Sequence, residues 1–164
     1  MADGFQMIFE EPEFSIGTLE NGLIWSFRGE VNLRRIEHGL AVHQGLAVKY
    51  PKGFSVMTIV SPEVPLTMPT DARELSTRIT RDYQPHYCGI CEVIEGDGFR
   101  GSVARSVVAG VRLVARSTVP AKVFSDAATA SRWLGALMAP GARGETVGEE
   151  LAAASQRLRR YSKS

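Results

Sequence analysis

Residues 87–134 alternate short apolar runs with amphipathic runs, and this alternation constrains the fold more than any other feature of the sequence. Residues 89–94 and 121–124 have the composition of short buried strands. Residues 100–116 carry valines at helical spacing, and Ser125-Asp126 opens a further helix. Because buried strands that alternate with helices are typical of parallel pairing, the segment predicts a β-α-β-α unit of an α/β domain.

The composition is that of one ordinary soluble domain, since the 164 residues are 44% hydrophobic and 23% charged. A net charge of +1 gives no overall field that would attract nucleic acid, so we expect no such partner. No apolar run reaches membrane-spanning length, and the first residues lack a basic region followed by an apolar stretch. We therefore expect no membrane span and a cytoplasmic location. Two cysteines are too few for a disulfide framework.

The N-terminal half supplies a hairpin, a helix and a strand. Residues 14–20 and 23–27 flank Asn21-Gly22, a dipeptide that favours the centre of a two-residue hairpin turn. Asn32 is a good N-cap for a first helix, which the Tyr50-Pro51-Lys52-Gly53 segment ends. Residues 54–60 are apolar and partly β-branched, so they predict the next strand.

A loop and two further helices complete the predicted elements. The segment 61–69 contains three prolines, and Thr70 or Asp71 then caps the second helix. Asp126 caps a last core helix, which we expect to bury Trp133, Leu134 and Leu137. Residues 1–140 are predicted to form a single domain. Residues 141–164 form a polar, helix-prone tail that docks on the domain, pairs with a second subunit or stays free.

The predicted elements give an α/β fold with a mixed, mostly parallel sheet, an N-terminal β-hairpin and about four helices. With the run Val123-Phe-Ser-Asp-Ala-Ala-Thr-Ala-Ser-Arg-Trp-Leu134, this order resembles the SpoIIAA-like fold. Anti-sigma-factor antagonists (the STAS group) and bacterial proteins described as STAS/SEC14-like share that fold. The resemblance covers roughly residues 14–137.

The resemblance implies a regulatory site at the start of the second helix. In the antagonist family, a serine at that place is phosphorylated and switches binding to a kinase partner. The matching segment 66–74 lacks the family's Asp-Ser pair, but it offers two threonines and flanking charges as partner or phospho-switch residues: Thr67, Thr70, Asp71 and Arg73. We expect a contact surface formed by residues 61–70, the second helix and the start of the third.

Two motifs suggest chemistry, and each has a structural alternative. Cys88 and Cys91 lie three apart on a predicted strand, which points them to opposite faces, so we interpret them as small buried residues. Glu95 and Asp97 follow the carboxyl end of that strand, where open α/β sheets place ligands. Glycines beside them favour a simple turn as the other interpretation.

Positive and titratable side chains on the helices give weaker signals. Arg105, Arg112 and Arg116 share one face of the third helix, and Ser102 lies near its N-terminus, so an anion site and a solvated face are both open interpretations. His38 and His43 are five apart and do not share a face, so we expect solvated or half-buried histidines.

The sequence favours a non-catalytic regulatory or protein-interaction module. No serine or threonine has a recognisable base beside it, and we expect no catalytic residue, cofactor or metal. The protein partner is not identified by any motif, and a homodimer through the hairpin edge or the tail stays open. One alternative is a small-molecule or lipid-binding domain of SEC14-like type, with a pocket between sheet and helices. Another is an uncharacterised enzyme that uses Cys88, Glu95 or Asp97.

Overall fold

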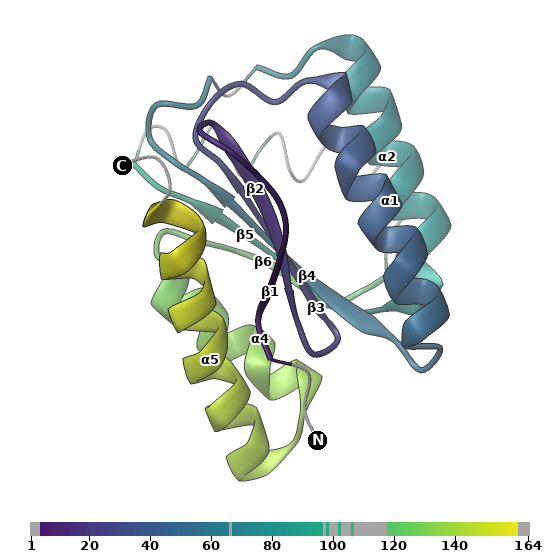
Figure 1. Cartoon of the computed structure of the whole chain (residues 1–164), viewed down its shortest axis with the longest axis vertical. Coiled ribbons are helices and arrows are strands. Elements are labelled where there is room, and N and C mark those ends of the chain that lie inside the picture. Colours follow the sequence, from purple (N-terminus) through teal and green to yellow (C-terminus); the bar gives the residue numbers. More distant parts are fainter. Residues whose placement is uncertain are drawn as a thin grey trace.

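A mixed six-stranded sheet, in the order β1-β2-β3-β4-β5-β6, separates two layers of helices (Figure 1). The computed structural model describes residues 4–65, 67–96, 98, 102, 106 and 118–160. Its strands are β1 (Gln6–Glu11), β2 (Phe14–Leu19), β3 (Gly22–Phe27), β4 (Phe54–Val60), β5 (Tyr87–Ile94) and β6 (Ala121–Phe124). Its helices are α1 (Leu33–Lys49), α2 (Thr70–Tyr83), the short 3-10 helix η1 (Gln84–His86), α4 (Ala127–Met138) and α5 (Gly141–Arg160).

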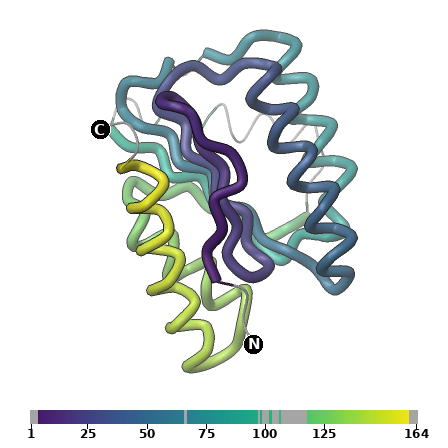
Figure 2. The backbone as a smooth tube through the Cα atoms, in the orientation of Figure 1, coloured from purple at the N-terminus to yellow at the C-terminus, as the bar shows by residue number. Residues whose placement is uncertain are grey.

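The pairing of the strands confirms the predicted α/β class. β1, β2 and β3 form an antiparallel meander, and β3, β4, β5 and β6 pair in parallel. The tube in Figure 2 shows α1 and α2 side by side on one side of the sheet and α5 on the other. Each face therefore has its own apolar core, one beneath α1 and α2 and one beneath α4 and α5.

The predicted hairpin is present, but its turn lies one residue earlier than expected. Leu19 pairs with Gly22, so Glu20 and Asn21 form the turn and Gly22 already belongs to β3. Glu20, with a φ of 50°, takes the left-handed conformation that Asn21-Gly22 was expected to supply. Asn21 has another role, because its side-chain amide donates to the carbonyl of Gly53 at 3.2 Å and ties the turn to the start of β4.

The helix starts confirm two predicted caps and correct a third. The carboxamide of Asn32 accepts from the backbone N–H of Arg35, and the carboxylate of Asp126 accepts from that of Thr129. In α2 the N-cap position belongs to Pro69, which has no side-chain cap. Thr70 is already the first helical residue, so neither it nor Asp71 can occupy the capping position.

The segment beyond residue 140 docks on the sheet as α5. Its apolar side chains are buried in the core beneath α4 and α5: Val147, Leu151, Ala154 and Leu158. Arg28 fixes the far end of this helix, because its guanidinium donates to the carbonyl of Leu158 at 2.8 Å and to the hydroxyl of Ser15 at 2.7 Å. In α4, Leu134 is buried as predicted and Trp133 is half-buried, but Leu137 is 38% exposed because it lies at the margin of the core against Gly89.

Glycines let α4 and α5 approach each other closely. A Cβ on Gly135 would lie 2.6 Å from the backbone nitrogen of Gly148 and from the carbonyl oxygen of Gly144. Gly135→Ala should therefore push the helices apart and lower the free energy of unfolding by about 2 kcal/mol in a urea titration. Gly45→Ala, in an exposed part of α1 with nothing within 4 Å, should instead raise it by about 0.8 kcal/mol. Equal effects of the two substitutions would contradict the close packing.

Candidate functional site

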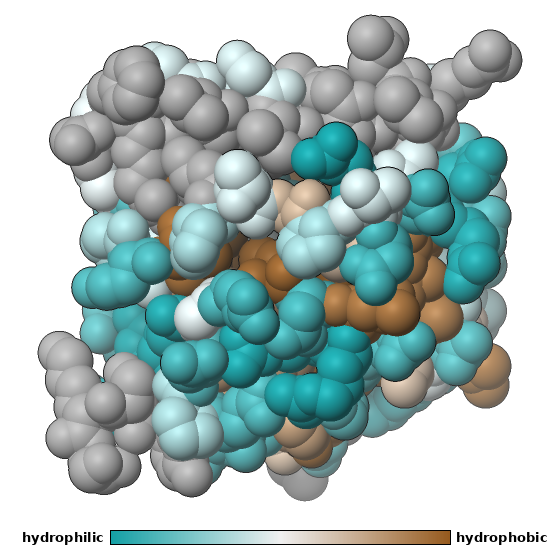
Figure 3. All heavy atoms as spheres, turned by 90° about the horizontal axis from the view of Figure 1, so that it is seen from above, coloured by the Kyte–Doolittle hydropathy of each residue, from teal (hydrophilic) through white to brown (hydrophobic). Residues whose placement is uncertain are grey.

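A cavity of about 180 Å³ lies between the sheet and the helices α1 and α2. Its lining extends from Tyr87 and Ala121, the first residues of β5 and β6, to Phe27, Val60 and Ile94, the last residues of three neighbouring parallel strands. The cavity therefore reaches the carboxyl edge of the sheet. Open α/β sheets place their ligands at this edge. Figure 3, viewed from the top of Figure 1, shows apolar side chains (brown) between polar ones on that face. The cavity therefore combines the position and the surface chemistry of a ligand site.

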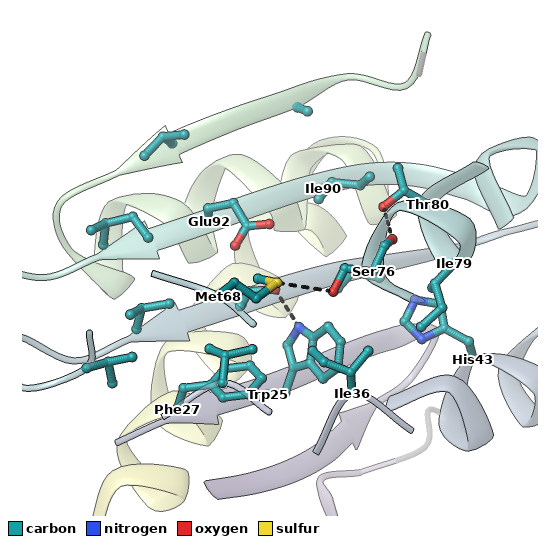
Figure 4. A pocket seen from close by; sticks show the side chains of 18 of the residues that line it. Trp25, Phe27, Ile36, His43, Met68, Ser76, Ile79, Thr80, Ile90 and Glu92 are labelled. Carbon is teal, nitrogen blue, oxygen red and sulfur yellow. Dashed lines mark hydrogen bonds between the residues drawn. The ribbon is translucent and has the colours of Figure 1, made fainter. Parts of the chain in front are cut away.

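Most of the lining is apolar. Trp25 and Phe27 contribute aromatic rings from β3, and Ile36, Ile79 and Ile90 contribute aliphatic side chains from α1, α2 and β5 (Figure 4). The lining also contains hydroxyl groups and a carboxyl group: those of Thr58, Thr67, Ser76, Thr80, Tyr87 and Glu92. An apolar wall with a few placed polar groups is typical of small-molecule sites.

A row of three polar side chains crosses the floor of the cavity. Trp25, Thr58 and Glu92 are register partners in β3, β4 and β5, so the sheet itself brings them side by side. The indole N–H of Trp25 donates to the Thr58 hydroxyl, which in turn forms a hydrogen bond with the Glu92 carboxyl group. The donor–acceptor direction of Thr58 is thereby fixed from Trp25 towards Glu92.

Glu92 is held as an uncharged acid at neutral pH. The Glu92 side chain is half-buried, and desolvation of its carboxyl group raises the pKa to about 8, although the hydrogen bond from Thr58 favours the ionised form. Among the described residues, no basic side chain forms an ion pair with Glu92. Lys122 also lines the cavity, but it is exposed and its ammonium lies 5.4 Å from the centre of the Phe124 ring.

His43 and Tyr87 close the cavity at the end of α1. The Nδ1 of His43 lies 2.8 Å from the carbonyl oxygen of Gly39, which can only accept, so Nδ1 carries the proton. Nε2 then accepts from the Tyr87 hydroxyl at 2.8 Å. His43 is only 1% exposed, contrary to the expected solvated or half-buried histidine, because Gly39 and Tyr87 satisfy both ring nitrogens inside the core. His38 is half-buried and stacks on Phe9.

The buried imidazole makes stability depend on pH. Burial lowers the pKa of His43 to about 4, although the bond to Gly39 favours the charged form, and the unfolded chain keeps a value near 6.5. The unfolded state then binds more protons below pH 6.5, so this group's contribution is present above that pH and is lost towards pH 4. We expect the contribution of His43 to fall by about 2 kcal/mol from pH 7.5 to pH 5, measured in denaturant titrations as the change in the stability difference between the wild type and His43→Gln. Identical slopes in both proteins would contradict the buried neutral ring.

Of the four residues that the sequence predicted as a partner or phospho-switch site, the structure brings Thr67 to the cavity. Thr67 is exposed and lines the rim. Thr70, Asp71 and Arg73 are exposed in the first turn of α2, where the Asp71 carboxylate accepts from the neighbouring Ala72 N–H. Ser102 is exposed, and its hydroxyl donates to the Gly98 carbonyl at 3.1 Å. The remaining candidates lie outside the described residues: Asp97, Arg105, Arg112 and Arg116.

The two cysteines lie in different environments. Cys91 is fully buried in the core beneath α4 and α5, whereas Cys88 is half-buried beside Gly53. Burial raises the pKa of both thiols, so each stays protonated and weakly nucleophilic at neutral pH. Within the described part of the chain, no three His, Cys, Asp or Glu side chains lie together as metal ligands would.

The sequence interpretation missed the row formed by Trp25, Thr58 and Glu92. One signal was available, because Glu92 is the single charged residue in the run Gly-Ile-Cys-Glu-Val-Ile over 89–94. A strand with both faces covered normally has no charged residue, so a carboxyl group there indicates a special environment. Thr58 is the corresponding polar residue near the middle of β4.

Comparisons with protein-family models, with curated proteins and with solved structures gave no match for this chain. The resemblance to the SpoIIAA-like proteins therefore stays a prediction from the sequence. None of the helices within the described ranges combines the length and the apolar character needed to cross a bilayer.

Proposed function

We propose that this protein is a small-molecule-binding domain whose ligand occupies the cavity between the sheet and the helices α1 and α2. The observation that carries the proposal is the half-buried Glu92 side chain, whose carboxyl group lies in a mostly apolar cavity that reaches the carboxyl edge of parallel strands. A core that served stability alone would gain from an apolar side chain at this position. This is the alternative that the sequence left open beside the protein-interaction role.

The cavity has room for a small ligand. Its volume of about 180 Å³ exceeds the ~150 Å³ of an apolar protein cavity that binds benzene. Benzene is therefore a suitable probe, because it needs no knowledge of the natural ligand. We expect saturable methyl NMR shifts at Ile36, Ile79 and Ile90, which line the cavity, and none at Ile59, which is buried on the opposite face of the sheet.

A variant that fills the cavity tests this site directly. Ser76 lies on α2 and lines the cavity, and its hydroxyl makes only a long contact of 3.8 Å with the Met68 sulfur. Ser76→Phe should therefore place a ring in the cavity and abolish the benzene shifts. Thr146→Phe, on the exposed side of α5, is the matched control and should leave them unchanged. Absence of saturable shifts in the wild type would overturn the proposal.

A regulatory interaction role is the second candidate, and one observation favours it. Thr67 lines the rim of the cavity, and Thr70 and Arg73 follow it as exposed residues. A partner bound to this edge would therefore sense whether the cavity is filled. Thr70→Glu should abolish capture of a specific protein partner from the source cell, whereas Thr146→Glu on α5 should not. Capture that survives Thr70→Glu would count against this edge as the contact surface.

A further inference from the structure

The polar row ends at a carboxyl group that faces the cavity. Trp25 donates a hydrogen bond to Thr58, and Thr58 forms a hydrogen bond with Glu92, so the row ends at the Glu92 carboxyl group. Figure 4 shows this carboxyl group extending from β5 towards Met68 and Ser76. A carboxylic acid offers one O–H donor in addition to its acceptor sites. A ligand in the cavity therefore meets a hydrogen-bond donor at a fixed position on an apolar floor.

We propose that the cavity selects an uncharged, mostly apolar carbonyl compound, whose carbonyl oxygen accepts a hydrogen bond from the Glu92 carboxylic acid. The inference rests on the proposed function, since it names the class of ligand for the same cavity. Ketones, esters, lactones and amides share this acceptor.

The charge around the row favours an uncharged ligand. Among the described residues, the titratable groups that face Glu92 or line the cavity with it are His43 on α1, Tyr87 on β5 and Lys122 on β6. Cys91 is its neighbour on the opposite face of β5. His43 and Tyr87 are hydrogen-bonded to each other. Both are neutral at pH 7, because burial lowers the pKa of His43 and raises the pKa of Tyr87. Lys122 is exposed at the outer margin. Within the described part of the chain, a charged ligand would be desolvated without a buried opposite charge to meet it.

The volume limits the ligand to about one ring with a short substituent, because an apolar cavity of ~150 Å³ already suits benzene. Acetophenone has this size and carries one carbonyl group. α-Methylstyrene has the same shape with a methylene group in place of the carbonyl oxygen. The pair therefore separates binding of an apolar ring from recognition of the carbonyl group.

The indole N–H resonance of Trp25 reports binding, because this group begins the polar row. The second indole belongs to Trp133, which lies on α4 beside Phe124. In Trp133→Phe the remaining indole N–H resonance is therefore that of Trp25. At pH 6.5 we expect acetophenone to bind about tenfold more tightly than α-methylstyrene, the gain typical of one well-placed hydrogen bond. The preference should decline above pH 8, where Glu92 loses its proton.

Two variants separate the hydrogen bond from the shape of the cavity. Glu92→Gln keeps an N–H donor at the same place, so it should retain most of the preference for acetophenone and lose its pH dependence. Glu92→Leu has no donor, so both probes should bind with equal affinity. Loss of binding of both probes in Glu92→Leu would contradict the inference, because the apolar cavity should still accept them.

The outcomes separate the inference from the proposed function. Equal affinity of acetophenone and α-methylstyrene for the wild type would overturn the carbonyl inference and leave the cavity as a ligand site. Binding of neither probe would overturn both. Tighter binding of phenethylammonium, with an affinity that rises towards pH 8, would also overturn the inference, because the partner of Glu92 would then be a cation.

Discussion

Glu92→Gln is expected to stabilise the protein by about 3 kcal/mol at pH 7 and by only about 1 kcal/mol at pH 5. The pKa of Glu92 is about 8 in the folded protein and near 4.5 in the unfolded chain, so the unfolded state releases this proton first as the pH rises. The group therefore lowers the free energy of unfolding between pH 4.5 and pH 8. Glutamine cannot ionise, so the variant does not undergo this pH-dependent decrease in the free energy of unfolding. Urea titrations of both proteins at the two pH values provide the measurement.

A matched substitution shows whether the effect belongs to the buried site. Glu145→Gln changes an exposed carboxylate on α5 and should shift the free energy of unfolding by less than about 0.5 kcal/mol at either pH. If Glu92→Gln were neutral or destabilising at pH 7, Glu92 would not be a buried acid with a raised pKa. A stabilising substitution at this position would fit a residue kept for binding rather than for stability.

Arg35→Met is expected to lower the free energy of unfolding by about 3 kcal/mol, because hydrogen bonds to charged groups stabilise by about 1.5–3 kcal/mol each. Arg35 is only 6% exposed. Its guanidinium donates to the Glu11 carboxylate at 2.9 Å, to the Glu13 carboxylate at 3.0 Å and to the Glu30 carbonyl at 2.6 Å. These bonds anchor the start of α1, the helix that forms one wall of the cavity.

Arg34 is the natural control, because it is the preceding residue and pairs with the same carboxylate. Its side chain is 53% exposed, so Arg34→Met should cost less than about 1 kcal/mol. Burial alone would raise the pKa of Glu11, but the hydrogen bonds from Arg34 and Arg35 lower it, so the stability from this cluster is lost as the pH falls. Equal losses in Arg34→Met and Arg35→Met would show that burial does not set the strength of these pairs.

The parallel part of the fold could be predicted from the sequence because its strands are short, apolar and separated by strong helix signals. β4 and β6 have the predicted bounds, and Asn32 and Asp126 cap the helices as expected. β1 escaped prediction because it is a half-buried edge strand with a bulge, and its exposed Ile8 breaks the alternation of polar and apolar residues that is typical of such a strand. Such a strand gains its order from pairing with β2 rather than from its own composition.

The docking of α5 and the composition of the site depend on contacts that local patterns do not encode. Gly144 and Gly148 form much of the contact of α5 with α4, and glycine adds nothing to a hydrophobic stripe. Trp25, Thr58 and Glu92 are far apart in the sequence, and only the register of three parallel strands makes them neighbours. A single carboxyl group in an apolar strand could indicate an unusual environment, but it could not name its partners.

A crystal structure of the protein pressurised with xenon tests the central claim most directly, because xenon occupies apolar cavities without specific hydrogen bonds. We predict xenon density between the sheet and α2, in contact with Ile79 and Ile90 and next to the carboxyl group of Glu92. Side chains packed through this space, with no xenon density there, would contradict the account.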